Sequence, residues 1–119
     1  MRRVALVEDN PDNRLLVRAL LTGHFEVVEY ATGSEALAAF EEAIPDLVLL
    51  DISLPGMDGI EVLTRLRARP RTRQIPVIAL TAQAMRGDRE RLLRLGFDAY
   101  LAKPILDPDE LIGAIEALL

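Results

Sequence analysis

The 119-residue chain has no cysteine and no tryptophan, a single histidine, and a single lysine beside thirteen arginines. The absence of cysteine excludes a disulfide framework and a thiol nucleophile, and it fits a reducing cytosol. No apolar run approaches the roughly 18 residues of a membrane span, and no secretory signal precedes the first apolar segment. The net charge of −5 argues against general binding to DNA or to anionic membranes. We therefore expect a soluble, cytoplasmic protein.

The single lysine, Lys103, lies directly before Pro104. An arginine side chain ends in a planar fork, whereas a lysine ends in a compact point charge on a thin stem. A chain that otherwise uses only arginine therefore indicates, at Lys103, a site that needs one small positive charge. The lone histidine, His24, follows Gly23 in a predicted turn, and we interpret it as a surface residue.

Half of the residues are hydrophobic but few are aromatic, so we expect one domain, residues 1–119, with an aliphatic core. Short apolar runs alternate with helical patterns five times. The runs, which we predict to be strands, are Val4–Val7, Phe25–Tyr30, Leu47–Leu50, Val77–Leu80 and Asp98–Leu101. The third and fourth are apolar throughout, which is typical of parallel strands that are covered on both faces.

The segments between these runs begin and end with helix signals. Helix starts are predicted at Asn10-Pro11, at Thr32 with Glu35, and at Asp107-Pro108 with Glu110. Helix stops are predicted at Gly23, Pro70 and Gly96. The last segment, Pro108–Leu119, carries an apolar stripe along one side. Five strand–helix units predict an α/β fold with a parallel sheet, because parallel strands require crossover connections.

Polar residues follow or end four of the predicted strands. They are Glu8, Asp9, Asp51, Thr81 and Lys103. Ligand sites in open α/β sheets form beyond the carboxyl ends of the strands, so these residues are predicted to meet around one crevice. Three carboxylates there would repel one another by about 4 kcal/mol per pair at contact distance. A hard cation that prefers oxygen ligands, Mg²⁺ or Mn²⁺, would neutralise them.

A carboxylate beside such a cation can attack phosphorus and form an aspartyl phosphate. Asp51 is the predicted nucleophile, because it follows the most buried strand. Glu8 and Asp9 would hold the metal, Lys103 would pair with the phosphoryl oxygens, and the Thr81 hydroxyl would donate a hydrogen bond to them.

The segments Val7–Asn10, Leu50–Gly59, Leu80–Ala82 and Lys103–Pro104 resemble the signature of response-regulator receiver domains of two-component signalling. The resemblance covers essentially the whole chain. It implies the flavodoxin-like, doubly wound, five-stranded parallel sheet with strand order 2-1-3-4-5 and five helices. It also implies a phosphoacceptor switch that catalyses its own phosphorylation and slow autodephosphorylation, without conventional turnover.

By this resemblance, Asp51 takes a phosphoryl group from a phosphohistidine on a sensor histidine kinase or a histidine phosphotransfer protein. The implied Mg²⁺ ligands are Glu8, Asp9, Asp51 and the main-chain carbonyl of Ser53; Mn²⁺ can substitute. Thr81 and Tyr100 would form the switch, and the small Ala82 would keep the phosphoryl site open. The resemblance further implies a cis peptide bond before Pro104. Ser53 and Gln83 would flank the path of the attacking water.

The resemblance implies an output face on the fourth helix, fifth strand and fifth helix, around Arg86, Arg89, Tyr100 and Asp109.

Arginines crowd the end of the third helix and the loop after it, where we expect a solvated face. They are Arg65, Arg67, Arg69, Arg71 and Arg73. In the first helix, Leu15 falls with Arg14 and Arg18 on the side away from the core, where it could contact the phosphodonor.

Other functions are compatible with parts of the same sequence. The module could belong to a hybrid histidine kinase or a larger regulator, or it could be a docking domain that works without phosphorylation. A phosphatase of the haloacid-dehalogenase type is rejected, because that family has a second Asp two residues after the nucleophile and this chain has Ser53. Dinucleotide binding is rejected because no Gly-rich turn follows the first strand.

Overall fold

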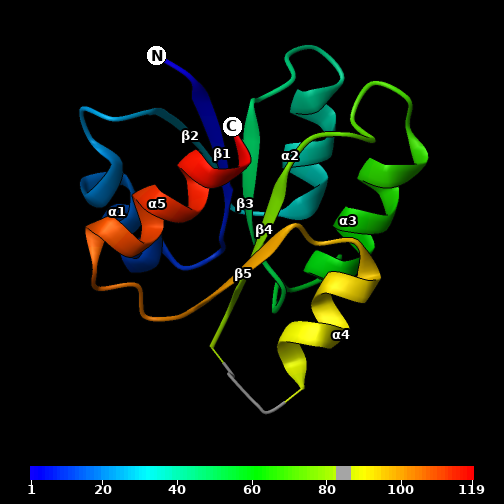
Figure 1. Ribbon diagram of the computed structural model, residues 1–119. Coiled ribbons are helices and arrows are strands. Elements are labelled where there is room, and N and C mark those ends of the chain that lie inside the picture. Colours follow the sequence, from blue (N-terminus) through cyan, green and yellow to red (C-terminus); the bar gives the residue numbers. More distant parts are fainter. Residues whose placement is uncertain (83–86) are drawn as a thin grey trace.

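The computed structural model describes residues 1–82 and 87–119, and within them the chain forms one parallel sheet between two layers of helices (Figure 1). The strands pair in the order β2-β1-β3-β4-β5. Their bounds are Arg3–Val7 (β1), Glu26–Tyr30 (β2), Leu47–Asp51 (β3), Val77–Thr81 (β4) and Ala99–Ala102 (β5). Every pairing is parallel. The predicted fold class and strand order are confirmed, with strand bounds displaced by one residue at several ends.

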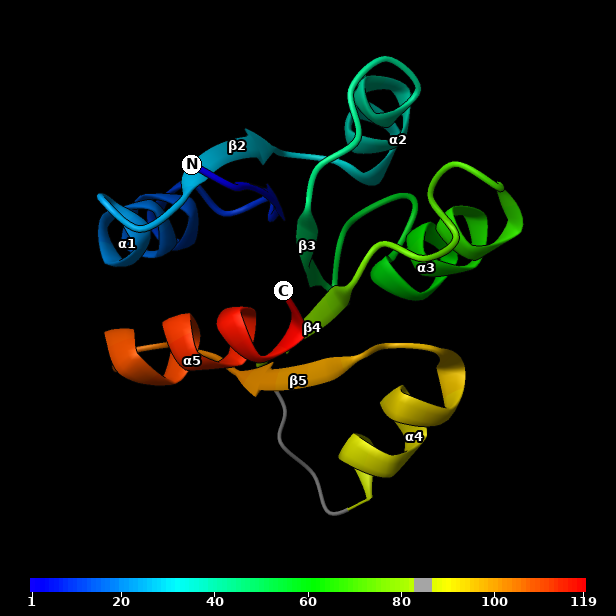
Figure 2. The same ribbon diagram turned by 45° about the horizontal axis from the view of Figure 1, so that its top comes forward.

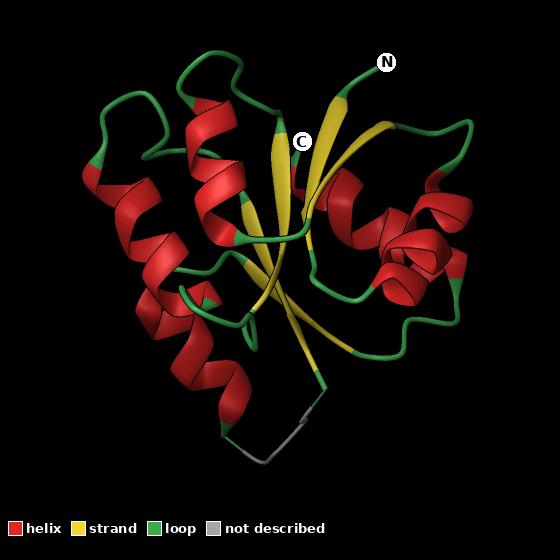
Figure 3. Cartoon of the chain, turned by 180° about the vertical axis from the view of Figure 1, so that it is seen from behind, coloured by secondary structure: helices red, strands yellow, loops and turns green. Residues whose placement is uncertain are grey.

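Five helices cover the two faces of the sheet. They are α1 (Pro11–Leu21), α2 (Gly33–Phe40), α3 (Gly59–Ala68), α4 (Asp88–Leu95) and α5 (Pro108–Leu118). Helices α1 and α5 lie on one face, and α2, α3 and α4 lie on the other (Figure 2). The view from behind shows the same two layers (Figure 3). Within the described ranges, none of these helices is long and apolar enough to cross a membrane.

Helices α1, α2 and α5 begin at the capping residues that the sequence predicts. The Asn10 side chain accepts hydrogen bonds from the backbone N–H groups of Asp12 and Asn13, at 2.8 and 3.2 Å. Thr32 caps α2 through the N–H of Glu35, at 3.1 Å. Asp107 caps α5 through the N–H of Asp109. These side chains satisfy amides that the first helical turn leaves without partners.

The core is aliphatic and lies on both faces of the sheet. Strands β3 and β4 are buried along their whole length, as their unbroken apolar runs predict. Along β3 the side chains alternate: Val48 and Leu50 pack with α2, α3 and α4, while Leu47 and Leu49 pack with α1 and α5. The central strand is therefore rigidly held, and the residue at its carboxyl end, Asp51, is held with it.

The prediction of a solvated arginine face is wrong for Arg67. Its guanidinium donates to the carbonyl oxygens of Arg73 (2.9 Å), Ile75 (2.7 Å) and Gly96 (3.1 Å), and to Asp98 Oδ2 (3.0 Å). A planar fork with five donors can satisfy several carbonyls at once. Arg67 therefore ties the end of α3 to the loops that precede β4 and β5.

We expect Gly59→Ala to lower the free energy of unfolding by about 1–3 kcal/mol, the usual cost of overpacking. A Cβ at Gly59 would collide with the Asp51 carbonyl oxygen and lie 2.6 Å from Ile52 Cα. Gly113→Ala is the matched control, because a Cβ there meets nothing within 4 Å and alanine favours the helix by up to about 1 kcal/mol. Denaturant unfolding measures both; a Gly59→Ala variant as stable as the wild type would contradict the packing.

Candidate functional site

The carboxyl ends of β1 and β3 bring the predicted acidic residues together. Glu8 and Asp9 directly follow β1, and Asp51 is the last residue of the neighbouring strand β3. Glu8, Asp9 and Asp51 each offer a carboxylate oxygen within 4.8 Å of the others. Glu8 and Asp51 are 1% and 2% exposed, whereas Asp9 is exposed. The predicted convergence of the three acids is confirmed.

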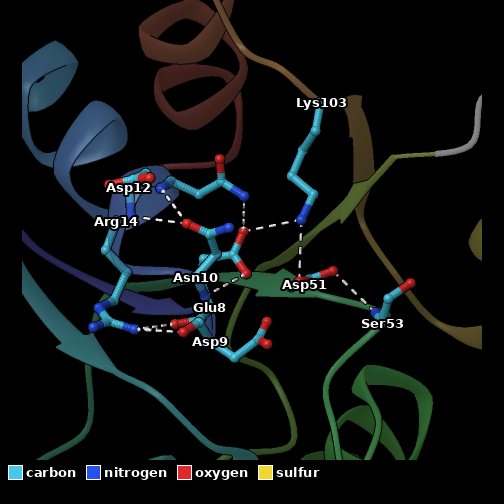
Figure 4. Close-up of polar contacts among 9 residues, drawn as sticks. Glu8, Asp9, Asn10, Asp12, Arg14, Asp51, Ser53 and Lys103 are labelled. Atoms are coloured by element: carbon cyan, nitrogen blue, oxygen red, sulfur yellow. Dashed lines mark hydrogen bonds and ion pairs between the residues drawn. The ribbon is translucent and has the colours of Figure 1, made fainter.

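Lys103 lies between two of these acids. Its Nζ is 2.9 Å from Glu8 Oε1 and 3.1 Å from Asp51 Oδ2 (Figure 4). The main-chain N–H of Lys103 donates to the Thr81 carbonyl at 2.7 Å, which fixes the backbone of Lys103 beside the end of β4. The Lys103–Pro104 peptide bond is cis, as expected. The single lysine of the chain thus contacts residues 95 and 52 positions away in the sequence.

Burial and the neighbouring carboxylate control the charge of this cluster. Burial raises the pKa of Glu8, and the adjacent Asp51 raises it further, while Lys103 offsets only part of the effect. For Lys103, burial lowers the pKa, but its hydrogen bonds and attraction to Glu8 and Asp51 outweigh this and raise the pKa overall. Lys103 therefore carries its positive charge at neutral pH.

The other predicted site residues lie around this cluster. The Ser53 N–H donates to Asp51 Oδ1 at 2.9 Å, so each oxygen of the Asp51 carboxylate has a donor. Thr81 is buried at the end of β4, and Ala82 follows it as an exposed residue. Tyr100, on β5, is half-buried and packs against the core on the α2–α4 side. Gln83 and Arg86 lie outside the described residues.

Two residues at the start of α1 contact the site, and sequence reasoning did not assign them to it. Asn13 Nδ2 donates to Glu8 Oε1 at 3.0 Å. Arg14, predicted to face away from the core beside Leu15, instead turns its guanidinium back to the carbonyl oxygens of Glu8 (2.8 Å) and Asp9 (3.1 Å). Leu15 is 57% exposed, as predicted. One feature of the sequence does indicate a role for Arg14: it is a cation in the first turn of a helix, where the helix dipole disfavours a positive charge.

Comparison with known proteins gives the family. A model of the response regulator receiver domain matches residues 4–116. The chain belongs to the response regulator receiver family. Among curated receivers, it is 44% identical over 108 residues to the polar-differentiation response regulator DivK of Brucella ovis. That match covers 90% of this chain and 88% of DivK.

Two further comparisons show receivers within larger proteins. The phosphate regulon transcriptional regulatory protein PhoB of Rhizobium meliloti is 42% identical over 118 residues; the match covers 98% of this chain and 52% of PhoB. The solved receiver domain of the sensor histidine kinase PA1611 from Pseudomonas aeruginosa PAO1 superposes with a TM-score of 0.88 at 37% identity. It covers 98% of this chain and 96% of that one, and it was solved with a magnesium ion coordinated in its active-site cleft.

The acidic cluster of this receiver has the donor chemistry of a magnesium site. Its three carboxylates offer only oxygen ligands, and two of the three are buried in a cluster that has one ammonium group for compensation. Mg²⁺ binds through a few carboxylates while it retains several waters, and an exposed Asp9 leaves one side of the cluster open to solvent. The cluster can therefore bind a divalent cation of this class.

In the metal-free receiver, Glu8→Gln is expected to raise the Tm of unfolding at neutral pH. Because the folded state raises the pKa of Glu8, folding favours the protonated form and ionisation destabilises the fold. The penalty is absent below the pKa of the unfolded chain, grows as pH rises, and is complete above the raised pKa of the folded protein.

Thermal unfolding in EDTA between about pH 4 and pH 8 should show a Tm advantage of Glu8→Gln that grows with pH. Glu42→Gln, at an exposed position after α2, is the matched control for the loss of one negative charge. A Tm difference between Glu8→Gln and the wild type that stays constant across this range would show that ionisation of Glu8 does not destabilise the folded state.

Proposed function

We propose that this receiver is a signalling switch in which Asp51 accepts a phosphoryl group from a phosphohistidine and phosphorylation changes protein-partner binding. One observation carries the proposal: the Lys103 ammonium lies between Glu8 and Asp51 at 2.9 and 3.1 Å, inside a cluster of three carboxylates. Such a cluster supplies a nucleophile, metal ligands and a cation for the phosphoryl oxygens within one small volume.

The reaction follows from the surroundings of Asp51. A carboxylate oxygen of Asp51 attacks phosphorus in line with the leaving imidazole, so that a P–O bond forms as the P–N bond breaks. Lys103 is close enough to exchange its contact with Asp51 for one with the transferred phosphoryl group. The Ser53 N–H holds the acceptor carboxylate in orientation. The near-complete burial of Glu8 and Asp51 strengthens the contacts of these two carboxylates.

Glu8, Asp9, Asp51 and the Ser53 main-chain carbonyl would hold Mg²⁺. The bound ion would screen the charge of the phosphoryl oxygens during transfer. Mn²⁺ can substitute, since it accepts the same oxygen ligands. The magnesium ion in the PA1611 receiver, which is 37% identical to this chain, supports the assignment.

The switch would consist of Thr81 and Tyr100. Thr81 is the last residue of β4, which pairs with β5. Its hydroxyl would move onto the phosphoryl group, and the Tyr100 ring would fill the space left behind. The small Ala82 would leave the phosphoryl site accessible. Moving a two-state equilibrium from 1:99 to 99:1 takes about 5.5 kcal/mol, and a new dianion bonded to Thr81 and Lys103 can supply much of this.

The signal would leave through α4, β5 and α5, where Arg89 and Asp109 are exposed and Tyr100 is half-buried. The phosphodonor would be a sensor histidine kinase or a histidine phosphotransfer protein, and the exchange would take place in the cytoplasm. The output partner is a protein rather than DNA, given the net charge of −5. A receiver of this kind can span most of a relative or only part of one, since the match covers 88% of DivK and 52% of PhoB.

Incubation with acetyl phosphate and Mg²⁺ should add one phosphoryl group, and Asp51→Asn should abolish the addition, because an amide is not a nucleophile at neutral pH. Intact-mass spectrometry measures the mass increase. Asp58→Asn is the control, since Asp58 caps α3 through the Glu61 N–H and is exposed. Equal labelling of the Asp51→Asn variant would remove Asp51 from its role.

Lys103→Arg should impair switching although it keeps the charge. The broad, planar guanidinium cannot replace a point charge that contacts Glu8 Oε1 and Asp51 Oδ2 at about 3 Å in a buried space. With beryllofluoride and Mg²⁺ as a phosphoryl mimic, amide NMR shifts of β4 and β5 should change in the wild type and change much less in the variant. Wild-type shifts in Lys103→Arg would show that any cation suffices.

A further inference from the structure

The loop that carries Glu8 and Asp9 lies beyond the last residue of β1, where the hydrogen-bond ladder of the strand has ended. The Glu8 N–H still donates to the Tyr30 carbonyl at 3.0 Å. The carbonyl oxygens of Glu8 and Asp9 both accept from the same nitrogen, Arg14 Nη1, at 2.8 and 3.1 Å (Figure 4). One side chain thus holds two consecutive carbonyls of the acidic loop.

Arg14 is itself held in place by β2. Its Nε lies 3.5 Å from Glu29 Oε1, and the two side chains are 22% and 21% exposed. Arg18, one turn further along α1, pairs with the other oxygen of Glu29 at 2.9 Å. Two arginines therefore share one carboxylate, but of these two only Arg14 continues from it to the acidic loop in the contacts of the described residues. The guanidinium is fixed at both ends.

Asn13 fixes the side chain of Glu8 in the same way that Arg14 fixes its backbone. Asn13 Nδ2 donates to Glu8 Oε1 at 3.0 Å, the same oxygen that Lys103 contacts at 2.9 Å. The second oxygen of Glu8 is 3.4 Å from the Asn10 N–H. A neutral amide orients the carboxylate without adding a charge to a cluster that already holds three acids.

The position of Arg14 has an energetic cost that its contacts offset. Arg14 is the fourth residue of α1, close to the positive end of the helix dipole, where a cation typically costs about 0.3–1 kcal/mol. Helical side chains lean toward the N-terminus, so this residue points back at the loop that precedes the helix. A cation at this position that contacted only solvent would have no interaction to offset this cost.

We propose that Asn13 and Arg14 are positioning residues for the divalent ion: Asn13 orients the Glu8 carboxylate, and Arg14 holds the Glu8–Asp9 backbone in the conformation that presents both acids. The inference rests on the proposed function, since it concerns the same metal site. Neither residue is a ligand. Each acts through a carboxylate, as outer partners of metal ligands generally do, and loss of such a partner typically costs about 10–100-fold in metal affinity.

The test compares Arg14→Met with Arg18→Met in the full chain. Each substitution removes one ion pair with Glu29, but only the first frees the two loop carbonyls. Mg²⁺ titrations followed by amide NMR should give a dissociation constant raised about tenfold or more for Arg14→Met and for Asn13→Ala. The constant for Arg18→Met should stay within about twofold of the wild type, because its contacts do not reach the acids.

Phosphorylation by acetyl phosphate as a function of Mg²⁺ concentration separates positioning from general destabilisation. The half-saturating Mg²⁺ concentration should rise in Arg14→Met and Asn13→Ala, while the rate at saturating Mg²⁺ should recover to near the wild-type value. Arg14→Lys should give an intermediate result, because one ammonium cannot reproduce a fork that spans Glu29 and the loop.

The outcomes distinguish the two proposals. Wild-type Mg²⁺ affinity in both Arg14→Met and Asn13→Ala, with Tm lowered as in Arg18→Met, would overturn the positioning role and leave the phosphoacceptor site intact. Should Arg14→Met fail to fold, the Mg²⁺ affinity of Asn13→Ala decides between the outcomes. That substitution removes the Asn13 hydrogen bond to Glu8 and leaves the Arg14 contacts in place. A wild-type chain that binds no Mg²⁺ would instead remove the proposed function, and with it the metal that the two residues are proposed to serve.

Discussion

Mutual repulsion among Glu8, Asp9 and Asp51 is the constraint around which the site is organised. Two like charges about 4 Å apart cost on the order of 4 kcal/mol at an effective dielectric constant of 20, and here two of the three carboxylates are almost fully buried. One ammonium, from Lys103, contacts two of them. Burial raises the pKa of Glu8, the neighbouring Asp51 raises it further, and Lys103 lowers it only in part. A divalent cation at this cluster would relieve the repulsion among the three carboxylates.

The sheet makes this concentration of charge structurally tolerable. Strands β1 and β3 are neighbours in the middle of the sheet, and their buried residues on both faces hold the two strand ends at a fixed separation. Helix α3 packs so closely behind the site that Gly59 leaves no room for a Cβ beside the Asp51 backbone. Hydrophobic burial elsewhere in the chain supplies the free energy that offsets the electrostatic cost of the acids, so the destabilised cluster persists within a stable fold.

The sequence was sufficient for the fold and for the acids, because both depend on local patterns and on a topological rule. Apolar runs with capping residues between them predict the strands and helices, and parallel topology then requires Glu8, Asp51 and Lys103 to meet. Arg14 and Arg67 were assigned wrongly, because helical periodicity locates a Cα and not the end of a long side chain. Both guanidiniums bind backbone carbonyl oxygens, and the positions of those carbonyls depend on where neighbouring elements end.

Lysine and arginine make different kinds of contact in this chain. Arg14 and Arg67 each contact two or more carbonyl oxygens of fixed loops, which is a task for a planar fork. Lys103 contacts two carboxylate oxygens that must release it, one toward a metal ion and the other toward a phosphoryl group, if the proposed chemistry takes place. A flexible stem with a compact charge can move between such partners without disturbing the backbone. Arg14 and Arg67 thus make backbone contacts that suit a planar fork, whereas the one lysine makes the contacts that the proposed chemistry would exchange.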